Sequence, residues 1–260
     1  MRDLPLEIVD RIVDFLPGGG QADAPRKRTP EGEGCWPRLA PYATLSPQFL
    51  EAVQRRIWRS LDISNHHLEE CARYLSNPLQ GRPGCLRDLT FRVDLPVVEM
   101  AAWGRYEQLE ETAAVSEEFG LHMRRLFDML HSLDDQGDQI EKGGGGAHNI
   151  HLHLADVAHE LPDDKSYVHR CCYDREPMTR YEFARKWRYD HVRITLPGID
   201  SFPLVHCVRH LSFGEWCRRP DPSVQLMMAA RMGPGLAAVD LVLDGNKGWT
   251  RRFSTRTAGA

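Results

Sequence analysis

The sequence predicts an α+β chain, with a small N-terminal helical unit over residues 1–60 and an irregular α/β solenoid over residues 61–250. Three observations lead to this class. Apolar residues recur at helical spacing near the start, leucine-centred strands recur through the rest, and helical segments lie between several of those strands. The hydrophobic fraction of 42% and the charged fraction of 27% are typical of a globular domain with a buried core.

Charge and cysteine content exclude several classes of protein. The net charge is -4 with a pI near 6.3, so no global field attracts nucleic acid or an anionic membrane. No run of about 18 apolar residues occurs, which predicts neither a membrane span nor a secretory signal. None of the seven cysteines lies in a CxxC motif, which favours reduced thiols. We therefore expect a cytoplasmic and/or nuclear protein with no membrane or nucleic-acid partner.

The first predicted helix starts at Pro5, where the missing N–H of proline costs nothing. Leu4, Ile8, Ile12 and Phe15 recur at helical spacing and share one face. This pattern predicts a short amphipathic helix that ends at the Pro-Gly-Gly-Gly run following it.

A polar segment separates this helix from the next. Residues 18–37 are rich in Gly, Pro, Arg and Glu and are predicted to be a flexible insert. Residues 39–45 form a short apolar turn or helix, and Ser46 and Pro47 then predict the N-cap and first position of a second long helix. The apolar stripe of that helix consists of Phe49, Leu50, Val53, Ile57 and Trp58.

From residue 58 the apolar period becomes alternating, which predicts strands. The strand centres are leucines separated by 28, 63, 59 and 30 residues, namely Leu61, Leu89, Leu152, Leu211 and Leu241. Two intervals match one repeat of about 30 residues and two match about twice that length, as insertions or missed repeats would produce. Residues 99–146 and 156–190 are the predicted insertions, and residues 251–260 are a predicted disordered tail.

Two helices are predicted between these strands. In the first insertion, five apolar residues follow helical spacing: Phe119, Met123, Leu126, Leu130 and Leu133. Near the end of the chain, Asp221 and Pro222 predict a cap and a first helical position.

The best candidate metal ligands are His148, His151 and His153, with His159, His169, Cys171 and Cys172 nearby in sequence. On a strand, His151 and His153 share a face and could reach one ion. The same spacing also arises if the intervening apolar residues face the core and the histidines face solvent. No CxxC or HxxxH pair supports a metal, so we expect neither a metal site nor a cofactor. An enzymatic role for this cluster is a weaker alternative.

Aromatic residues alternate with arginines and a lysine over residues 180–193. Such a mixture can stack on single-stranded nucleic acid. An amphipathic segment with its arginines in water explains it equally well, as does contact with an acidic protein. Motifs of serine hydrolases, P-loops, zincins and dinucleotide-binding folds are absent, so the sequence predicts no enzyme.

The N-terminal motifs resemble a known family. Residues 4–8 are Leu-Pro-Leu-Glu-Ile, residues 39–49 are LAPYATLSPQF, and Ile57 and Trp58 precede the first strand. These features resemble the F-box domain, especially in the form common in fungal F-box proteins. The strands and helices that follow, with LRDLTFRVDLP at residues 86–96, are similar to the irregular leucine-rich-repeat-like region of such proteins.

This resemblance implies an adaptor. The F-box-like unit would bind the Skp-type subunit of a Skp–cullin–F-box ubiquitin ligase, and the repeat region would bind an unidentified protein substrate. The expected partner-binding residues are Leu4, Pro5, Ile8, Ile12, Leu45, Phe49 and Trp58. The alternative is a structural scaffold protein in which the F-box-like helices only cap the solenoid. An adaptor predicts that some of these apolar residues are exposed, whereas a cap predicts that they are buried in the chain.

Overall fold

The computed structural model describes most of the helices and strands expected from the sequence. The described residues are 6–15, 40–75, 85–96, 107–141, 149–156, 168–169, 178–179, 193–214, 216, 218–242 and 250–254. Several predictions lie outside them: Leu4, Pro5, the insert at 18–37, His148, His159, Cys171, Cys172, residues 180–192 and the end of the tail.

The N-terminal part of the chain is helical and leads directly into the first strand. Its elements are α1 (Leu6–Phe15), η1 (Ala40–Thr44), α3 (Pro47–Arg59), β1 (Ser60–Ser64), η2 (Asn65–His67) and α4 (Leu68–Leu75). The N-cap of α3 is the predicted one, because the Ser46 hydroxyl accepts a hydrogen bond from Phe49 N at 3.3 Å. Pro47 stands at the first position, where its fixed φ favours the helix.

The rest of the chain alternates strands with helices of very different length. Its elements are β2 (Asp88–Val93), α5 (Leu109–Glu141), β3 (Ile150–Asp156), β4 (Val168–His169), β5 (Met178–Thr179), η7 (Ile199–Ser201), β6 (Val208–Phe213), α7 (Pro222–Arg231), η8 (Gly233–Gly235), β7 (Ala238–Val242) and β8 (Thr250–Ser254). The Asp221 carboxylate accepts a hydrogen bond from Ser223 N at 2.8 Å, which confirms the predicted cap of α7.

Six of the strands form one sheet in the order β1-β2-β3-β6-β7-β8. The pairs from β1 to β7 are parallel and β8 is antiparallel to β7. Four predicted strand centres, Leu61, Leu89, Leu152 and Leu211, lie in register across the sheet. On β7 the residue beside Leu211 is Val239. Strands β4 and β5 form a separate antiparallel pair.

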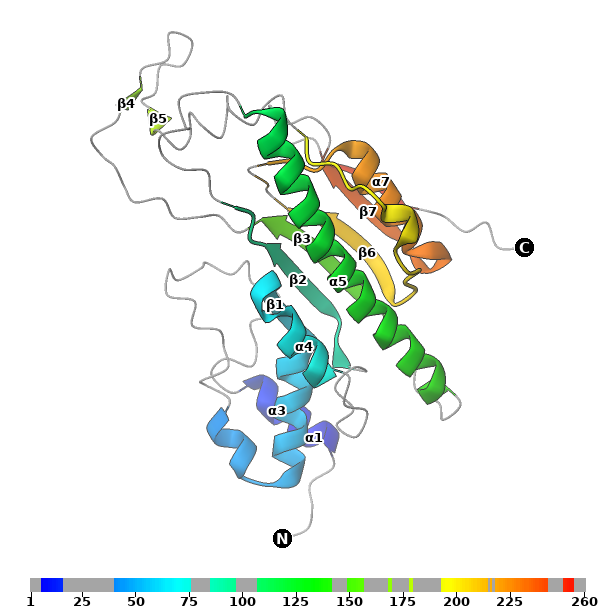
Figure 1. Cartoon of the computed structure of the whole chain (residues 1–260). Helices are drawn as coiled ribbons and strands as arrows, with labels where there is room; N and C mark the ends of the chain where they lie inside the picture. Colours follow the sequence, from blue (N-terminus) through cyan, green and yellow to red (C-terminus); the bar gives the residue numbers. More distant parts are fainter. Residues whose placement is uncertain are drawn as a thin grey trace.

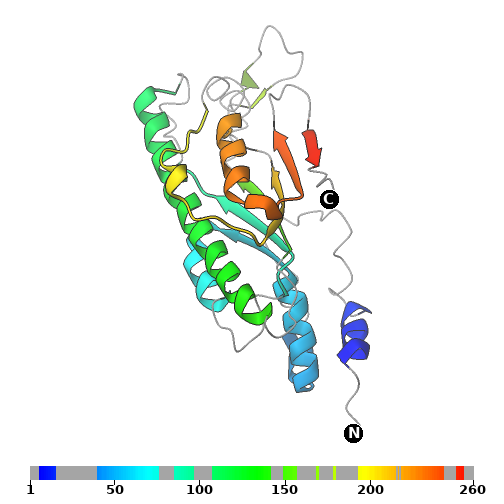
Figure 2. The ribbon, with the colours of Figure 1, turned by 90° about the vertical axis from the view of Figure 1, so that its right-hand side faces the viewer.

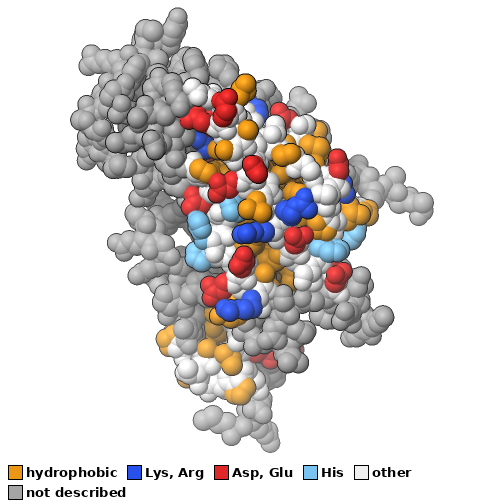
Figure 3. Space-filling model, in the orientation of Figure 1, with side chains coloured by type: hydrophobic (Ala, Val, Ile, Leu, Met, Phe, Trp, Pro, Cys, Tyr) orange, Lys and Arg blue, Asp and Glu red, His pale blue; other side chains and the backbone are white. Residues whose placement is uncertain are grey.

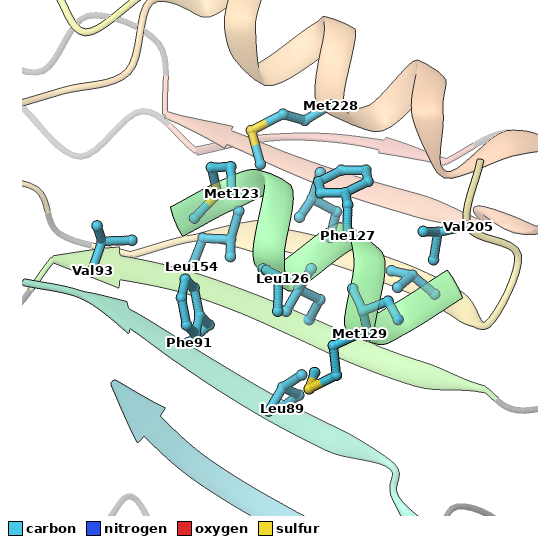
Figure 4. Close-up of a cluster of buried hydrophobic side chains, with 14 of the residues drawn as sticks. Leu89, Phe91, Val93, Met123, Leu126, Phe127, Met129, Leu154, Val205 and Met228 are labelled. Carbon is cyan, nitrogen blue, oxygen red and sulfur yellow. The ribbon is translucent and has the colours of Figure 1, made fainter. Parts of the chain in front are cut away.

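The helices α4, α5 and α7 lie on the same side of the sheet (Figures 1 and 2). Helix α5 crosses this face and buries the five apolar residues that its spacing singled out: Phe119, Met123, Leu126, Leu130 and Leu133. Figure 4 shows Leu126 and Phe127 of α5 between the sheet and α7, which contributes Met228. Although α5 lies within the predicted insertion at 99–146, its buried face belongs to the main core.

The predicted fold class, an α+β chain with a repeat solenoid, is wrong. The described residues form an α/β fold on one six-stranded sheet whose first five strands are parallel. The reason lies in the connections, since α4 has 8 residues and α5 has 33, so successive strand–helix units have no common size. One core cluster includes residues from β1 to β7, which makes the packing that of one sheet covered by unequal helices.

A buried ion pair joins segments at the ends of three elements. Arg218 Nε, after β6, lies 3.2 Å from Glu107 Oε1, just before α5, and Arg218 Nη1 donates to the carbonyl oxygen of Pro96 at 3.1 Å. The side chains of Arg218 and Glu107 are only 6% and 0% exposed. No helix in the described part of the chain is long and apolar enough to cross a membrane.

Candidate functional site

The N-terminal helices have a small core of their own. Val9 and Val13 of α1 are buried against Ala52 and Val53 of α3. Partly buried side chains around this pair are Tyr42, Ala43, Phe49 and Ile57. Among the described residues, α1 contributes none to the main core. The helices thus form a unit that packs separately from the core of the sheet.

The face of α1 next to this packed one is open. Ile8 and Ile12, one turn apart, keep 44% and 37% of their surface exposed, because the helix turns its Val9–Val13 face toward α3. In the same helical unit, Leu45 between η1 and α3 is 63% exposed, and Leu50 in the first turns of α3 is 42% exposed. Figure 3 shows hydrophobic side chains at the lower end of the molecule, where η1 and α3 lie.

We call these four residues, Ile8, Ile12, Leu45 and Leu50, the apolar docking surface. Three of them were predicted from the resemblance, whereas Leu50 was expected on the inner stripe of α3. Single exposed apolar residues are ordinary, but four large ones within one small helical unit are a feature of interaction sites.

Two other predicted partner-binding residues pack within the chain. Phe49 lies against the small helical core. Trp58 is half-buried against the main core, and its ring centroid lies 6.1 Å from that of Tyr74 on α4. Their packing holds the helices in place around the apolar docking surface. An ion pair adds to this, since Arg55 Nη1 of α3 lies 3.8 Å from the Asp10 carboxylate of α1.

A polar cluster lies on the sheet face opposite the main core. Ile150, Leu152 and Leu154 of β3 are buried, so His151 and His153 point to the other face, as one of the two sequence interpretations expected. The register between β3 and β6 shifts beside Ile150, because Ile150 pairs with Val208 while His151 pairs with His210. From His151 onward the register is regular, so His151 and His210 are direct neighbours, and their imidazoles stack with ring centroids 4.0 Å apart and planes within 4°.

Hydrogen bonds extend this cluster along the sheet. Ser212 Oγ lies 3.1 Å from His151 Nε2 and 2.8 Å from His153 Nδ1. Asp88 Oδ1 lies 3.8 Å from His151 Nδ1. Burial, and next the neighbouring His210 ring, lower the pKa of His151 below its ordinary value, against the opposing effect of Asp88. His210 Nε2 in turn lies 2.9 Å from Asp240 Oδ2 of β7.

The order Asp88–His151–Ser212 superficially matches the acid, base and nucleophile of a hydrolase. Two observations favour a structural network instead. Ser212 is buried within a strand and shares its hydroxyl between two imidazoles. A nucleophile also requires donors around the developing oxyanion, and Gly214 N, close to this cluster, already donates to Leu154 O at 2.7 Å.

The candidate metal site is not assembled in the described part of the chain. No group of three or more His, Cys, Asp or Glu side chains there has the geometry to hold an ion. Sequence reasoning found His151 and His153 but missed His210, Ser212 and Asp240. Each of those three occupies a polar position on a predicted strand, so alignment of the strand centres would have placed them on one face.

Comparison with known proteins adds no family assignment, because no family model, curated protein or solved structure matches this chain.

Proposed function

We propose that this chain is a substrate-recognition adaptor of a Skp–cullin–F-box ubiquitin ligase. In this proposal the N-terminal helices bind the Skp-type subunit, and the sheet region binds an unidentified protein substrate. No chemistry by the chain itself is required, and the protein would act in the cytoplasm and/or nucleus. The motif at residues 4–8 and the stretch LAPYATLSPQF at residues 39–49 suggest the family, as described above.

The observation that carries the proposal is the apolar docking surface. Ile8 and Ile12 remain over one third exposed although α1 has a packed face of its own. A helix that only capped the core of the sheet would turn such residues inward. The scaffold alternative is therefore supported less well, because α1 packs on α3 and adds no described residue to the main core.

The size of the surface indicates which elements take part. Helix α1 has 10 residues and is about 15 Å long. A stable protein complex buries about 1,200–2,000 Å² in total, which one such helix cannot provide. The contact must therefore include η1 and the start of α3, where Leu45 and Leu50 are exposed.

The test is co-purification of the full chain with a Skp-type subunit, comparing the wild type with an Ile8→Ala/Ile12→Ala variant. Burying a large aliphatic side chain contributes about 1.5–3 kcal/mol, and about 40% of each isoleucine remains to be covered. Together they give about 1–2 kcal/mol, so binding should weaken roughly 5- to 30-fold.

Leu226→Ala/Met227→Ala is the matched control, since these residues of α7 are similarly exposed, at 56% and 37%. This variant should bind like the wild type, and thermal unfolding should show that both variants remain folded. Equal binding by all three proteins would show that the site is wrong. A wild type that retains no Skp-type subunit would refute the adaptor proposal.

A further inference from the structure

The side chain of Asn65 has a defined orientation. Its Oδ1 accepts a hydrogen bond from Asp94 N at 2.9 Å, and its Nδ2 lies 3.5 Å from Asp94 O. Turning the amide over would place its NH₂ against the Asp94 N–H and its oxygen against the Asp94 carbonyl. Both contacts would then be repulsive. The peptide groups of Asp94, just after β2, therefore fix which atom of Asn65 faces the next neighbour.

That neighbour is His122 of α5. Its Nε2 lies 2.9 Å from Asn65 Nδ2, which is a donor only. The ring nitrogen must therefore accept, so His122 is neutral and carries its proton on Nδ1. The Nδ1 atom is buried and has no hydrogen-bond partner among the described residues. The hydrogen bond to Asn65 thus joins the middle of α5 to η2 and, through Asp94, to the end of β2.

An acceptor for the charged form lies one turn away. Glu118 Oε1 is 3.6 Å from the same Nε2 of His122, too far for a good hydrogen bond but close enough for a small rotation to close. A protonated ring has an N–H on Nε2, which repels the Asn65 amide and attracts the Glu118 carboxylate. The two possible partners of this one nitrogen therefore select opposite protonation states.

We propose that His122 is a proton-controlled latch that exchanges Asn65 for Glu118 when a proton from solvent binds Nε2. The neutral ring accepts the Asn65 hydrogen bond that joins α5 to η2 and the end of β2, and protonation to the imidazolium breaks that bond. This device goes beyond the adaptor function and does not depend on it. Switching between two discrete hydrogen-bond partners is a common basis for pH-sensitive conformational change.

The surrounding charges act in both directions. Burial is the main cause that lowers the pKa of His122 below its ordinary value, and Glu118 opposes it. Arg125 of α5 and His66 of η2 add smaller lowering effects. Two of the charged neighbours have partners of their own, because Arg125 Nη1 lies 3.7 Å from Glu69 of α4 and His66 Nε2 lies 2.9 Å from the Asp94 carboxylate.

The latch can be tested by NMR on the ¹⁵N-labelled full chain, following the His122 ring nitrogens and the Asn65 side-chain amide between pH 8 and pH 5. The His122 signals are identified by their loss in a His122→Gln variant. At pH 8 we expect the proton on Nδ1 and an acceptor at Nε2. As the ring titrates below its ordinary pKa of about 6.5, the Asn65 amide signal and the exchange protection of the Asp94 amide should change with the same midpoint.

Three substitutions separate the latch from an ordinary buried histidine. Glu118→Gln removes the negative charge that favours the imidazolium and should move the midpoint to lower pH. Glu117→Gln, the same change on the exposed side of α5, is the matched control and should leave the midpoint unchanged. Asn65→Asp replaces the donor with a carboxylate and should move the midpoint to higher pH.

Three results would overturn the proposal. One is a proton on Nε2 at pH 8, another is a titration of His122 that leaves the Asn65 amide unchanged, and the third is an equal shift in the Glu118 and Glu117 variants. Because Glu118 is 43% exposed at its side chain, its glutamine variant should fold normally, so each of these outcomes is measurable.

Discussion

Removing one partner of the buried Arg218–Glu107 pair should destabilise the protein severely. At the observed Nε–Oε1 separation of 3.2 Å, Coulomb attraction at an effective dielectric constant of about 20 is about 5 kcal/mol. Most of this offsets the desolvation of two buried charges, so the net stabilisation by the pair is small. An Arg218→Met variant, however, leaves the Glu107 carboxylate buried without this cation, and we expect a loss of about 3–5 kcal/mol in the free energy of unfolding.

Urea unfolding followed by tryptophan fluorescence provides the assay, because Trp216 is buried two residues from Arg218. The double variant Arg218→Met/Glu107→Gln should recover most of the lost stability, since no buried charge then remains at either position. Arg124→Met is the control, because Arg124 is an arginine on the surface side of α5 that bonds Ser201. A loss below about 1 kcal/mol for Arg218→Met, as at an exposed pair, would refute this account of the ion pair.

Three further predictions concern the core, a cap and pH. Phe127→Ala should lower the free energy of unfolding by about 3–5 kcal/mol, because Phe127 is fully buried against Phe202, with ring centroids 5.4 Å apart. Asp221→Ala should lower it by about 1 kcal/mol through loss of the α7 cap. Since the pKa of His151 is lowered on folding, the unfolded state binds more protons below pH 6.5. Stability should thus be complete above that pH and fall as the pH decreases, and His151→Gln should flatten this dependence in thermal melts.

Matched variants give each of these predictions a reference. Leu121→Ala, at an exposed position of α5, should cost far less than Phe127→Ala in the same unfolding experiment. Asp221→Ser keeps a capping oxygen and should retain the stability that alanine loses. For the pH series, the wild-type and His151→Gln curves should differ only below pH 6.5. A constant difference at every pH would show that lost packing, rather than titration, explains the variant.

Much of the sheet could be predicted from sequence because alternation of apolar residues reports directly which face of a strand is buried. Leu61, Leu89, Leu152 and Leu211 were identified as strand centres, and they are neighbours in register. The spacing between strands led to the wrong fold class. The 63 residues from Leu89 to Leu152 could form an insertion outside the core or, as α5 does, a helix that packs on the sheet, and the spacing does not distinguish the two.

Helical periodicity also left the orientation of α1 undecided. Ile8 and Val9 belong to the same apolar stripe in the sequence, and only packing against Ala52 and Val53 determines that Val9 turns inward and Ile8 outward. The break in register between β3 and β6 was likewise not predictable. Ile150 pairs with Val208 whereas His151 pairs with His210, so one strand moves by a residue relative to the other without a signal in the sequence.

The junction between α3 and β1 has a mechanical consequence. Helix α3 ends at Arg59 and β1 begins at Ser60, so the chain passes from one element to the other with no spacer. On the last turn of α3, Ile57 packs on the small helical core and Trp58 on the main core. A protein bound at the apolar docking surface would therefore have a fixed orientation relative to the sheet. The direction in which the sheet presents a bound molecule would be set by one helical turn.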